Sequence, residues 1–263
     1  MAEKAKKIKA LLLDLEGTLF LKGTQLPGAM QTIAGLREVG VEMRFLTNTD
    51  SKTTHTIQQE LAQLDLKVPE TEIFTAASAA RQFLKQHPDS RSFFLLSAEL
   101  QAAFDVFTKK DGPINFVVVG DCREQVTYET LNQAFQYLME GAELIALQKG
   151  RYFVRANGYN LDTGAFVQMF EYASGKTAQV MGKPTRTFFQ MGLDHLGFQA
   201  EEVLVVGDDV TTDVAGAKAL DARSVLVRTG KFSEQLLKQS SVQPDFIIDS
   251  IADLLKLVKE LGV

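Results

Sequence analysis

An apolar stretch that ends in two closely spaced carboxylates limits the fold of this chain more than any other feature. Residues 8–13 are apolar apart from Lys9, which predicts a strand buried on both faces, as in a parallel sheet. Asp14 and Glu16 follow, and both point to the same side because side chains alternate along an extended chain. Gly17 then permits a sharp turn. Since open α/β sheets bind ligands beyond the carboxyl ends of their strands, the pair marks a candidate site.

Two adjacent carboxylates repel each other, so their pairing indicates a bound metal ion or a reaction that uses both acids. The alternative is a strand followed by an ordinary acidic turn. The rest of the chain counts against that alternative, because the pattern of an apolar strand followed by polar side chains recurs. The later polar residues are Thr47 and Asn48, the acidic set Asp208, Asp209 and Asp213, and Lys183 in a Gly-Lys-Pro turn that opens a helix.

The order of predicted elements indicates an α/β fold with a doubly wound parallel sheet. A helix over 27–40, a strand over 41–46 and a helix over 52–64 alternate in the way that such sheets require. After Pro69 this regular alternation of strands and helices changes, and a second α/β unit of about 100 residues follows. We therefore expect a core of residues 1–77 and 178–263 with an inserted domain over 78–177. Within the insertion, residues 144–147 and 152–155 read as two strands that turn through Lys149-Gly150.

Composition excludes several classes of partner. The chain has 263 residues and a net charge of −5, so neither nucleic acid nor an anionic membrane is expected to bind it. No apolar run approaches the roughly 20 residues that span a bilayer. Cys122 is the only cysteine, which excludes an internal disulfide and favours a cytoplasmic location. We interpret Cys122 as a structural thiol.

The polar groups at the strand ends suit phosphoryl transfer. Mg²⁺ prefers a few carboxylates together with waters and phosphate oxygens. The charge of a phosphoryl group in transfer is neutralised by metal and lysine, and aspartate is a competent nucleophile.

Taken in order, the motifs resemble those of the haloacid dehalogenase superfamily. They are Asp-x-Glu-Gly-Thr at 14–18, Leu-Thr-Asn at 46–48, Gly-Lys-Pro at 182–184 and Gly-Asp-Asp-x-x-x-Asp at 207–213. The large insertion between the second and third motifs resembles the C2-type cap of the NagD-like phosphatases. The resemblance covers essentially the whole chain.

This resemblance implies a Mg²⁺-dependent phosphatase that acts on a small phosphorylated compound through an aspartyl-phosphate. It makes Asp14 the nucleophile and a metal ligand. The backbone carbonyl of Glu16 and the carboxylate of Asp208 complete the protein ligands. The remaining roles are phosphoryl binding by Thr47, Asn48 and Lys183, orientation of metal waters or of Lys183 by Asp213, and either an outer contact or a solvated position for Asp209.

Position 16 departs from the family pattern, in which an aspartate protonates the leaving group and then activates water. Glu16 keeps the carboxyl group but extends it by one methylene, and a misplacement of about 1 Å can cost on the order of 100-fold in rate. This leaves open a weakly active or non-catalytic protein that binds phospho-ligands. A dehalogenase is disfavoured, because it needs no Mg²⁺ and leaves the acidic cluster after residue 207 unexplained.

Substrate choice is expected to rest with the cap, whose contacts the shared motifs cannot supply. The stretch 152–162 is dense in polar side chains, and we name Arg155 and Asn157 as candidate specificity residues. An ordinary polar turn is the alternative. Relatives with this cap often pair through it, so the resemblance leaves a monomer and a homodimer through the cap both open. Residues 116–119 suit a cap core or an interface equally.

Overall fold

The strand that precedes Asp14 lies inside a six-stranded sheet, buried along its whole length. Strand β1 (Ala10–Asp14) pairs in parallel with β4 (Glu42–Thr47) and with β12 (Val203–Gly207). The strand order is β14-β13-β12-β1-β4-β5, and its crossovers confirm the predicted doubly wound α/β fold. The remaining strands of this sheet are β5 (Ile73–Thr75), β13 (Arg223–Val227) and β14 (Phe246–Ile248).

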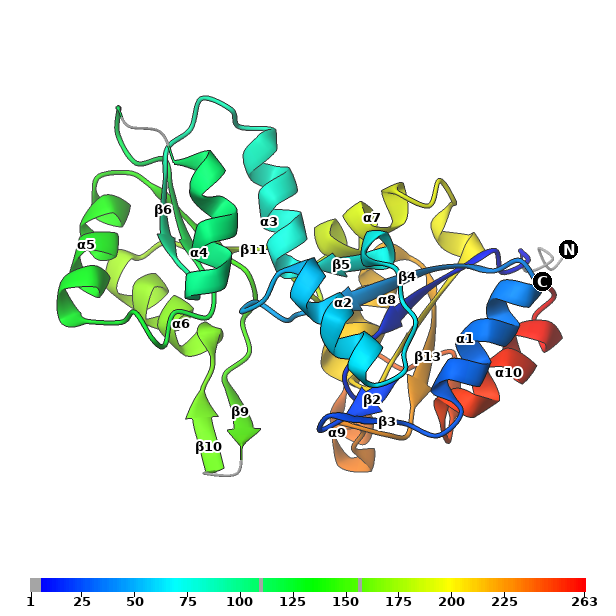
Figure 1. Cartoon of the computed structure of the whole chain (residues 1–263). Coiled ribbons are helices and arrows are strands. Elements are labelled where there is room, and N and C mark those ends of the chain that lie inside the picture. The colour runs from blue at the N-terminus through cyan, green and yellow to red at the C-terminus, as the bar shows by residue number, and fades with distance from the viewer. Residues whose placement is uncertain (1–5, 109–110, 156–157) are drawn as a thin grey trace, which may run out of the picture. The chain divides into compact units, whose positions relative to one another are not determined.

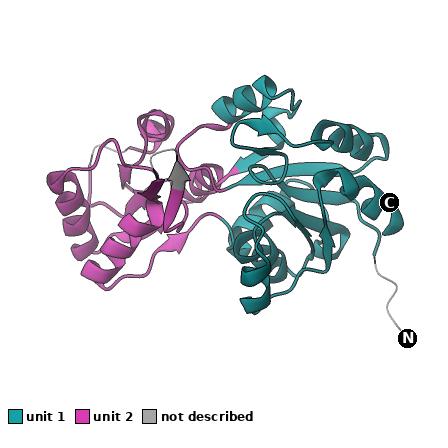
Figure 2. Cartoon of the chain, turned by 90° about the horizontal axis from the view of Figure 1, so that it is seen from below, with its two compact units in different colours: residues 1–47, 55–74, 183–263 teal, residues 48–54, 75–182 magenta. Residues whose placement is uncertain are grey.

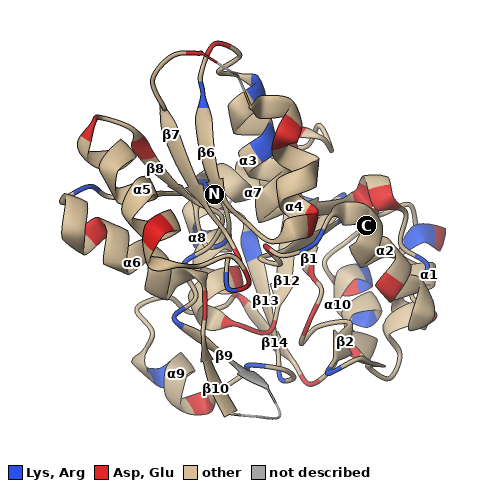
Figure 3. Cartoon of the chain, turned by 60° about the vertical axis from the view of Figure 1, so that its left-hand side comes forward, with Lys and Arg blue, Asp and Glu red and all other residues tan. Residues whose placement is uncertain are grey.

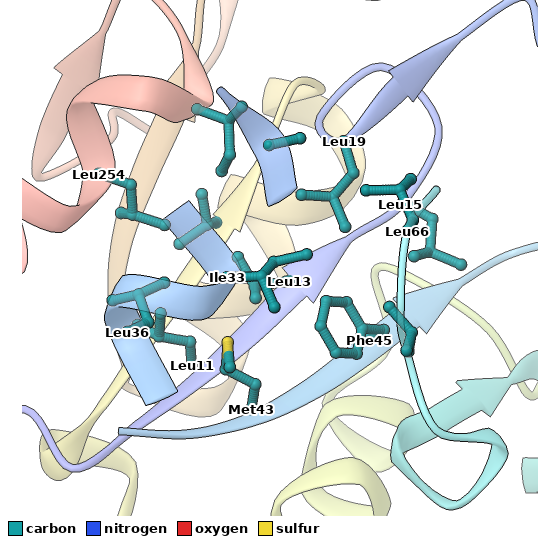
Figure 4. Close-up of a cluster of buried hydrophobic side chains, with 14 of the residues drawn as sticks. Leu11, Leu13, Leu15, Leu19, Ile33, Leu36, Met43, Phe45, Leu66 and Leu254 are labelled. Carbon is teal, nitrogen blue, oxygen red and sulfur yellow. The ribbon is translucent and has the colours of Figure 1, made fainter. Parts of the chain in front are cut away.

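One face of this sheet is covered by two helices that pack together, α1 (Ala29–Glu38) and α10 (Leu254–Glu260). Leu11 and Leu13 project from β1 into the same buried cluster as Ile33 of α1 (Figure 4). The alternation of side chains along β1 therefore places Asp14 on the side opposite Leu13.

The other face is covered by α7 (Arg186–Asp194), which packs against α8 (Ala215–Leu220). Gly192 of α7 lies against Leu46 of β4, the neighbour of the Phe45 that belongs to the cluster on the first face. Successive strand residues point to opposite faces, so α7 and α1 lie on opposite sides of the sheet. The peripheral elements near this sheet are β2 (Phe20–Leu21), β3 (Thr24–Gln25), α2 (Thr54–Gln63), η1 (Glu70–Glu72), η3 (Ala200–Glu202), α9 (Glu234–Gln239) and η5 (Ile251–Asp253).

The computed structural model describes residues 6–108, 111–155 and 158–263 (Figure 1). These form two compact units (Figure 2). Unit 1 takes the described residues of 1–47, 55–74 and 183–263, and unit 2 takes those of 48–54 and 75–182. Unit 2 thus includes the range 78–177 expected for the insertion, its flanks, and in addition the loop that follows Thr47.

Unit 2 is built on its own parallel sheet with the order β11-β8-β7-β6. Its core is separate from that of unit 1 and includes Val117, Leu144 and Phe170. Its elements are α3 (Ala76–Lys85), β6 (Ser92–Leu95), α4 (Ala98–Phe104), η2 (Asp105–Phe107), β7 (Phe116–Val119), α5 (Tyr128–Met139), β8 (Glu143–Ala146), β9 (Tyr152–Arg155), β10 (Gly158–Leu161), α6 (Thr163–Ser174) and β11 (Gln179–Val180).

Two expectations about unit 2 are settled by strand pairing. β8 and β9 do not form one hairpin, because β8 lies between β7 and β11 while β9 pairs with β10 in a separate two-stranded sheet. The residues 148–151 between them serve other contacts, such as the bond from Gln148 to Asp162. Strand β7, at 116–119, is interior to the sheet and buried throughout. It is therefore core of unit 2 and presents no surface for an interface.

Charged residues of both signs occur in both units (Figure 3). Individual helices can carry one sign, since α3 has the basic residues Arg81 and Lys85 and no acidic residue. Within residues 6–108, 111–155 and 158–263, no helix has the length and apolarity needed to cross a membrane.

Candidate active site

Four charged side chains from distant parts of the sequence meet at the carboxyl edge of the unit 1 sheet. Asp14 ends β1, and Asp208 directly follows β12. Asp213 lies in η4 (Val210–Val214), a π-helical turn, and Lys183 precedes α7. All four are buried, with exposed fractions between 2% and 8%. Since buried charges are rare unless they are paired, this arrangement indicates a functional site.

Lys183 links two of the carboxylates. Its Nζ donates hydrogen bonds to Asp14 Oδ1 at 2.5 Å and to Asp213 Oδ1 at 2.7 Å. Burial alone lowers the pKa of a lysine, but Asp14 and Asp213 outweigh it and raise the pKa of Lys183 above its ordinary value. The ammonium charge is thus fixed beside Asp14. The second oxygen of Asp14 accepts a hydrogen bond from Thr18 Oγ1 at 3.1 Å, which holds the carboxylate in one orientation.

The carboxylates of Asp14, Asp208 and Asp213 suit a divalent cation. One oxygen of each lies within 4.8 Å of the others. Burial, followed by the charges of Asp14 and Asp213, raises the pKa of Asp208 to about 8. Burial also raises the pKa of Asp213 to about 6, although Lys183 opposes the shift. Three carboxylates facing one ammonium leave an excess of negative charge. A hard cation such as Mg²⁺, which prefers carboxylate oxygens, would balance it.

The local backbone explains how Asp213 reaches this position. A Cβ at Gly207 would lie 2.2 Å from Asp213 Cγ, so the end of β12 must be glycine for η4 to pack against it. Asp213 Oδ2 accepts a hydrogen bond from the backbone of Asp209 at 3.2 Å. π-helical turns are rare and occur often at functional sites.

The second motif lies at the end of β4. Thr47 is its last residue and is buried, while Asn48 begins the loop that belongs to unit 2. A Cβ at Gly182 would lie 2.5 Å from Asn48 Oδ1, so Gly182 leaves room for the Asn48 amide. The structure thereby places Asn48 next to the residue that precedes Lys183.

Glu16 and Asp209 differ from the buried group. Glu16 is exposed to solvent and lies just beyond β1, where its backbone forms an isolated bridge with Phe20. Asp209 Oδ1 accepts hydrogen bonds from the backbone of Thr211 at 2.8 Å and from its hydroxyl at 2.6 Å. The Asp209 carboxylate therefore caps η4 and is absent from the cluster of carboxylates that suits a metal.

The cap candidates are only partly described. Arg155 ends β9, and Asn157 lies outside the described residues. Cys122 is buried, and burial, with Asp121 adding to it, raises the pKa of its thiol to about 12. The thiolate, the reactive form, is therefore absent at neutral pH, which agrees with a structural role.

Sequence reasoning missed two contributors to the site. The motif that contains Thr18 does not show that its hydroxyl orients Asp14. None of the four motifs includes the loop after β13, which bonds to Asp208 and to Gly17. The available signal was that β13 is another apolar strand followed by polar residues, Arg-Thr-Gly-Lys at 228–231.

Comparisons with known proteins identify the family of the chain. A family model described as haloacid dehalogenase-like hydrolase matches residues 11–107, and a second, described as HAD-hyrolase-like, matches 180–254. The haloacid dehalogenase-like hydrolase domain-containing protein 2 of Bos taurus is 39% identical over 227 residues, which cover 86% of each chain. The chain belongs to the haloacid dehalogenase-like hydrolase family.

Other members of this family are named as phosphatases. The phospholysine phosphohistidine inorganic pyrophosphate phosphatase of Xenopus laevis is 34% identical, over 96% of this chain and 95% of that one. The solved 4-nitrophenylphosphatase of Thermotoga maritima has a TM-score of 0.88 and 26% identity, over 95% of this chain and 97% of that one. These findings confirm the family that the sequence motifs indicate and support a hydrolase of the phosphatase class.

Proposed function

We propose that this protein is a Mg²⁺-dependent phosphatase that hydrolyses a small phosphorylated compound, with Asp14 as the nucleophile. The observation that carries the proposal is the buried cluster in which Lys183 contacts Asp14 and Asp213 while Asp208 lies beside them. A fixed positive charge next to a carboxylate at the edge of a parallel sheet suits an incoming phosphoryl group.

In the first step, a carboxylate oxygen of Asp14 attacks phosphorus and forms an aspartyl-phosphate. The bond from phosphorus to the leaving oxygen breaks, and that oxygen takes a proton from the carboxyl group of Glu16. Lys183 and Thr47 contact the phosphoryl oxygens, and Lys183 offsets their negative charge. The Asn48 amide orients the same group.

In the second step, the Glu16 carboxylate takes a proton from a water molecule, whose oxygen attacks phosphorus. The bond between phosphorus and Asp14 breaks, inorganic phosphate leaves, and Asp14 and Glu16 return to their starting states. The exposed position of Glu16 suits this role, because the group must exchange protons with leaving groups and with water.

Mg²⁺, when bound, neutralises charge on the phosphoryl oxygens. Asp14, Asp208 and the backbone carbonyl of Glu16 would hold it, while Asp213 fixes the ammonium of Lys183. The charge excess of the buried cluster supports this assignment. The alternative of a protein that only binds phospho-ligands is not favoured. Two proteins that are similar to this chain over nearly its whole length are named as phosphatases.

Turnover of p-nitrophenyl phosphate tests the proposal. We expect activity with Mg²⁺, its loss in excess EDTA, and its recovery when Mg²⁺ is restored. Asp14→Asn keeps the shape of the side chain but removes the nucleophile, so we expect no detectable turnover. Full activity in EDTA or in Asp14→Asn contradicts the mechanism.

The substrate is proposed to be small, with Arg155 and Asn157 contacting the part beyond the phosphoryl group. Contacts to a non-reacting part change discrimination between substrates. Arg155→Ala and Asn157→Ala should therefore reorder a panel of phosphorylated metabolites while the Mg²⁺ dependence stays as in the wild type. An unchanged order in both variants places specificity elsewhere.

Two further properties are proposed from the sequence. The single cysteine supports a cytoplasmic location. A homodimer through unit 2 is proposed from the family resemblance, on a surface other than the buried strand β7. Sedimentation at micromolar concentration tests the dimer, and a monomer under these conditions contradicts it.

A further inference from the structure

The loop that follows β13 contacts the candidate metal site, although none of the four family motifs includes it. β13 pairs in parallel with β12, and β12 pairs in parallel with β1, so the ends of all three strands meet at one edge. We propose that residues 229–231 form a positioning loop that holds the Asp208 carboxylate in the orientation required for metal binding, an inference that rests on the proposed Mg²⁺ site.

Two hydrogen bonds connect this loop to the segments that carry the metal ligands. The backbone N–H of Lys231 donates to Asp208 Oδ2 at 2.6 Å. The hydroxyl of Thr229 donates to the backbone carbonyl of Gly17 at 2.5 Å. The loop therefore reaches both the residue after β12 and the turn after β1, on which the Glu16 carbonyl lies.

Two glycines enclose the same oxygen of Asp208. A Cβ at Gly17 would lie 1.9 Å from Asp208 Oδ2, and a Cβ at Gly230 would lie equally close. A Cβ at Gly230 would also lie 2.5 Å from the Cα of Gly17. Both glycines have positive φ angles, +94° and +56°, so other residues are disfavoured there by backbone conformation as well as by space.

These contacts give the two carboxylate oxygens of Asp208 different surroundings. Oδ2 is enclosed by Gly17 and Gly230 and bonded to Lys231, which leaves Oδ1 as the oxygen available to a cation. Groups that orient a metal ligand from behind commonly change metal affinity by about 10- to 100-fold when they are lost. Thr229 and Gly230 are thus positioning residues, which act through Gly17 and Asp208.

Calorimetric titration of the whole protein with Mg²⁺ tests this inference without relying on activity. Gly230→Ala should weaken Mg²⁺ binding by about 10- to 100-fold, because the new methyl group displaces the Asp208 carboxylate. Gly40→Ala is the matched control, since Gly40 also has a positive φ of +78° but its Cβ would meet nothing within 4 Å. We expect Gly40→Ala to bind Mg²⁺ as the wild type does.

Thr229→Val and Thr229→Ser keep the test decisive if Gly230→Ala does not fold. Valine removes the hydrogen bond to Gly17 and should weaken Mg²⁺ binding, whereas serine retains the hydroxyl and should restore it. Wild-type affinity in both folded Gly230→Ala and Thr229→Val overturns the positioning role while the Mg²⁺ site stands. If the wild type itself binds no Mg²⁺, the proposed metal site fails, and this inference fails with it.

Discussion

Lys183 donates hydrogen bonds to carboxylates from two distant segments, and its loss leaves buried charge without a partner. Lys183→Met keeps much of the side-chain volume but removes the ammonium. We expect a loss of about 3 to 5 kcal/mol in the free energy of unfolding, measured by urea denaturation. Lys218→Met is the control, because its bond to Asp245 is partly exposed and exposed ion pairs contribute at most about 1 kcal/mol. Equal losses in the two variants contradict the account.

Glu16 has a different task, and its replacement should depend on the leaving group. Glu16→Gln cannot donate or accept the proton, so general acid–base catalysis of about 10²- to 10⁴-fold is lost. Nitrophenolate leaves without protonation, whereas an alkoxide does not. We therefore expect the first chemical step to slow more for an alkyl phosphate than for p-nitrophenyl phosphate, in single-turnover measurements. The same small effect on both substrates rules out Glu16 as the acid.

At the scale of elements, the loop of residues 48–54 is joined to the start of α6 by a buried carboxylate. Asp50 Oδ2 accepts a hydrogen bond from Thr163 Oγ1 at 2.5 Å. Burial raises the pKa of Asp50 to about 7, although the hydrogen bond from Thr163 lowers it. The negative charges of Asp162 and Asp121 add to the upward shift. Arg123 is a positively charged neighbour of these carboxylates and donates a hydrogen bond to Asp121.

The environment of Asp50 predicts how the stability of unit 2 changes with pH. Because the folded state holds a proton on Asp50 that the unfolded state has released above pH 4, Asp50 lowers stability progressively as the pH rises from about 4 to 7. Asp50→Asn removes the titrating group. We expect the melting temperature of the variant to rise relative to wild type over this range and to stay higher at pH 8. Parallel melting profiles against pH contradict this reading.

The elements that the sequence predicted well are those with a strong local signal. The strands β1 and β12 are apolar runs that lead directly into Asp14 and Asp208. Strand β4, which also contains Glu42 and Arg44, leads into Thr47 and Asn48. β11 is only two residues long and is defined by its pairing with β8, which no local pattern reveals. The assignment of the loop 48–54 to unit 2 depends on bonds such as Asp50 to Thr163, which join residues far apart in the chain.

The candidate site also has parts that the sequence predicts and parts that depend on contacts between distant residues. The sequence predicted Asp14, Lys183, Asp208 and Asp213 as neighbours, because parallel strands bring their carboxyl ends to one edge. It could not predict which oxygen of Asp208 faces a cation. That depends on the close approach of Gly230 and Gly17, which belong to turns after different strands.

For the whole molecule, two separate cores imply that the units respond differently to metal. A ligand that binds only the folded state adds about 2.7 kcal/mol at a concentration 100 times its dissociation constant. We expect saturating Mg²⁺ to raise the melting temperature of unit 1 by roughly 5 to 11 °C, with no direct effect on unit 2, in differential scanning calorimetry. Asp208→Asn should remove the shift. A shift of equal size in that variant contradicts the site.

The central claim is that Asp14 carries the phosphoryl group during turnover. The most direct test is to mix the protein with Mg²⁺ and substrate, quench in acid within the first turnover, and identify the modified residue by peptide mass spectrometry. The account predicts one phosphoryl group on Asp14, formed and lost at rates that match turnover, and none in Asp14→Asn. A phosphoryl group on another residue, or turnover that continues in Asp14→Asn, contradicts it.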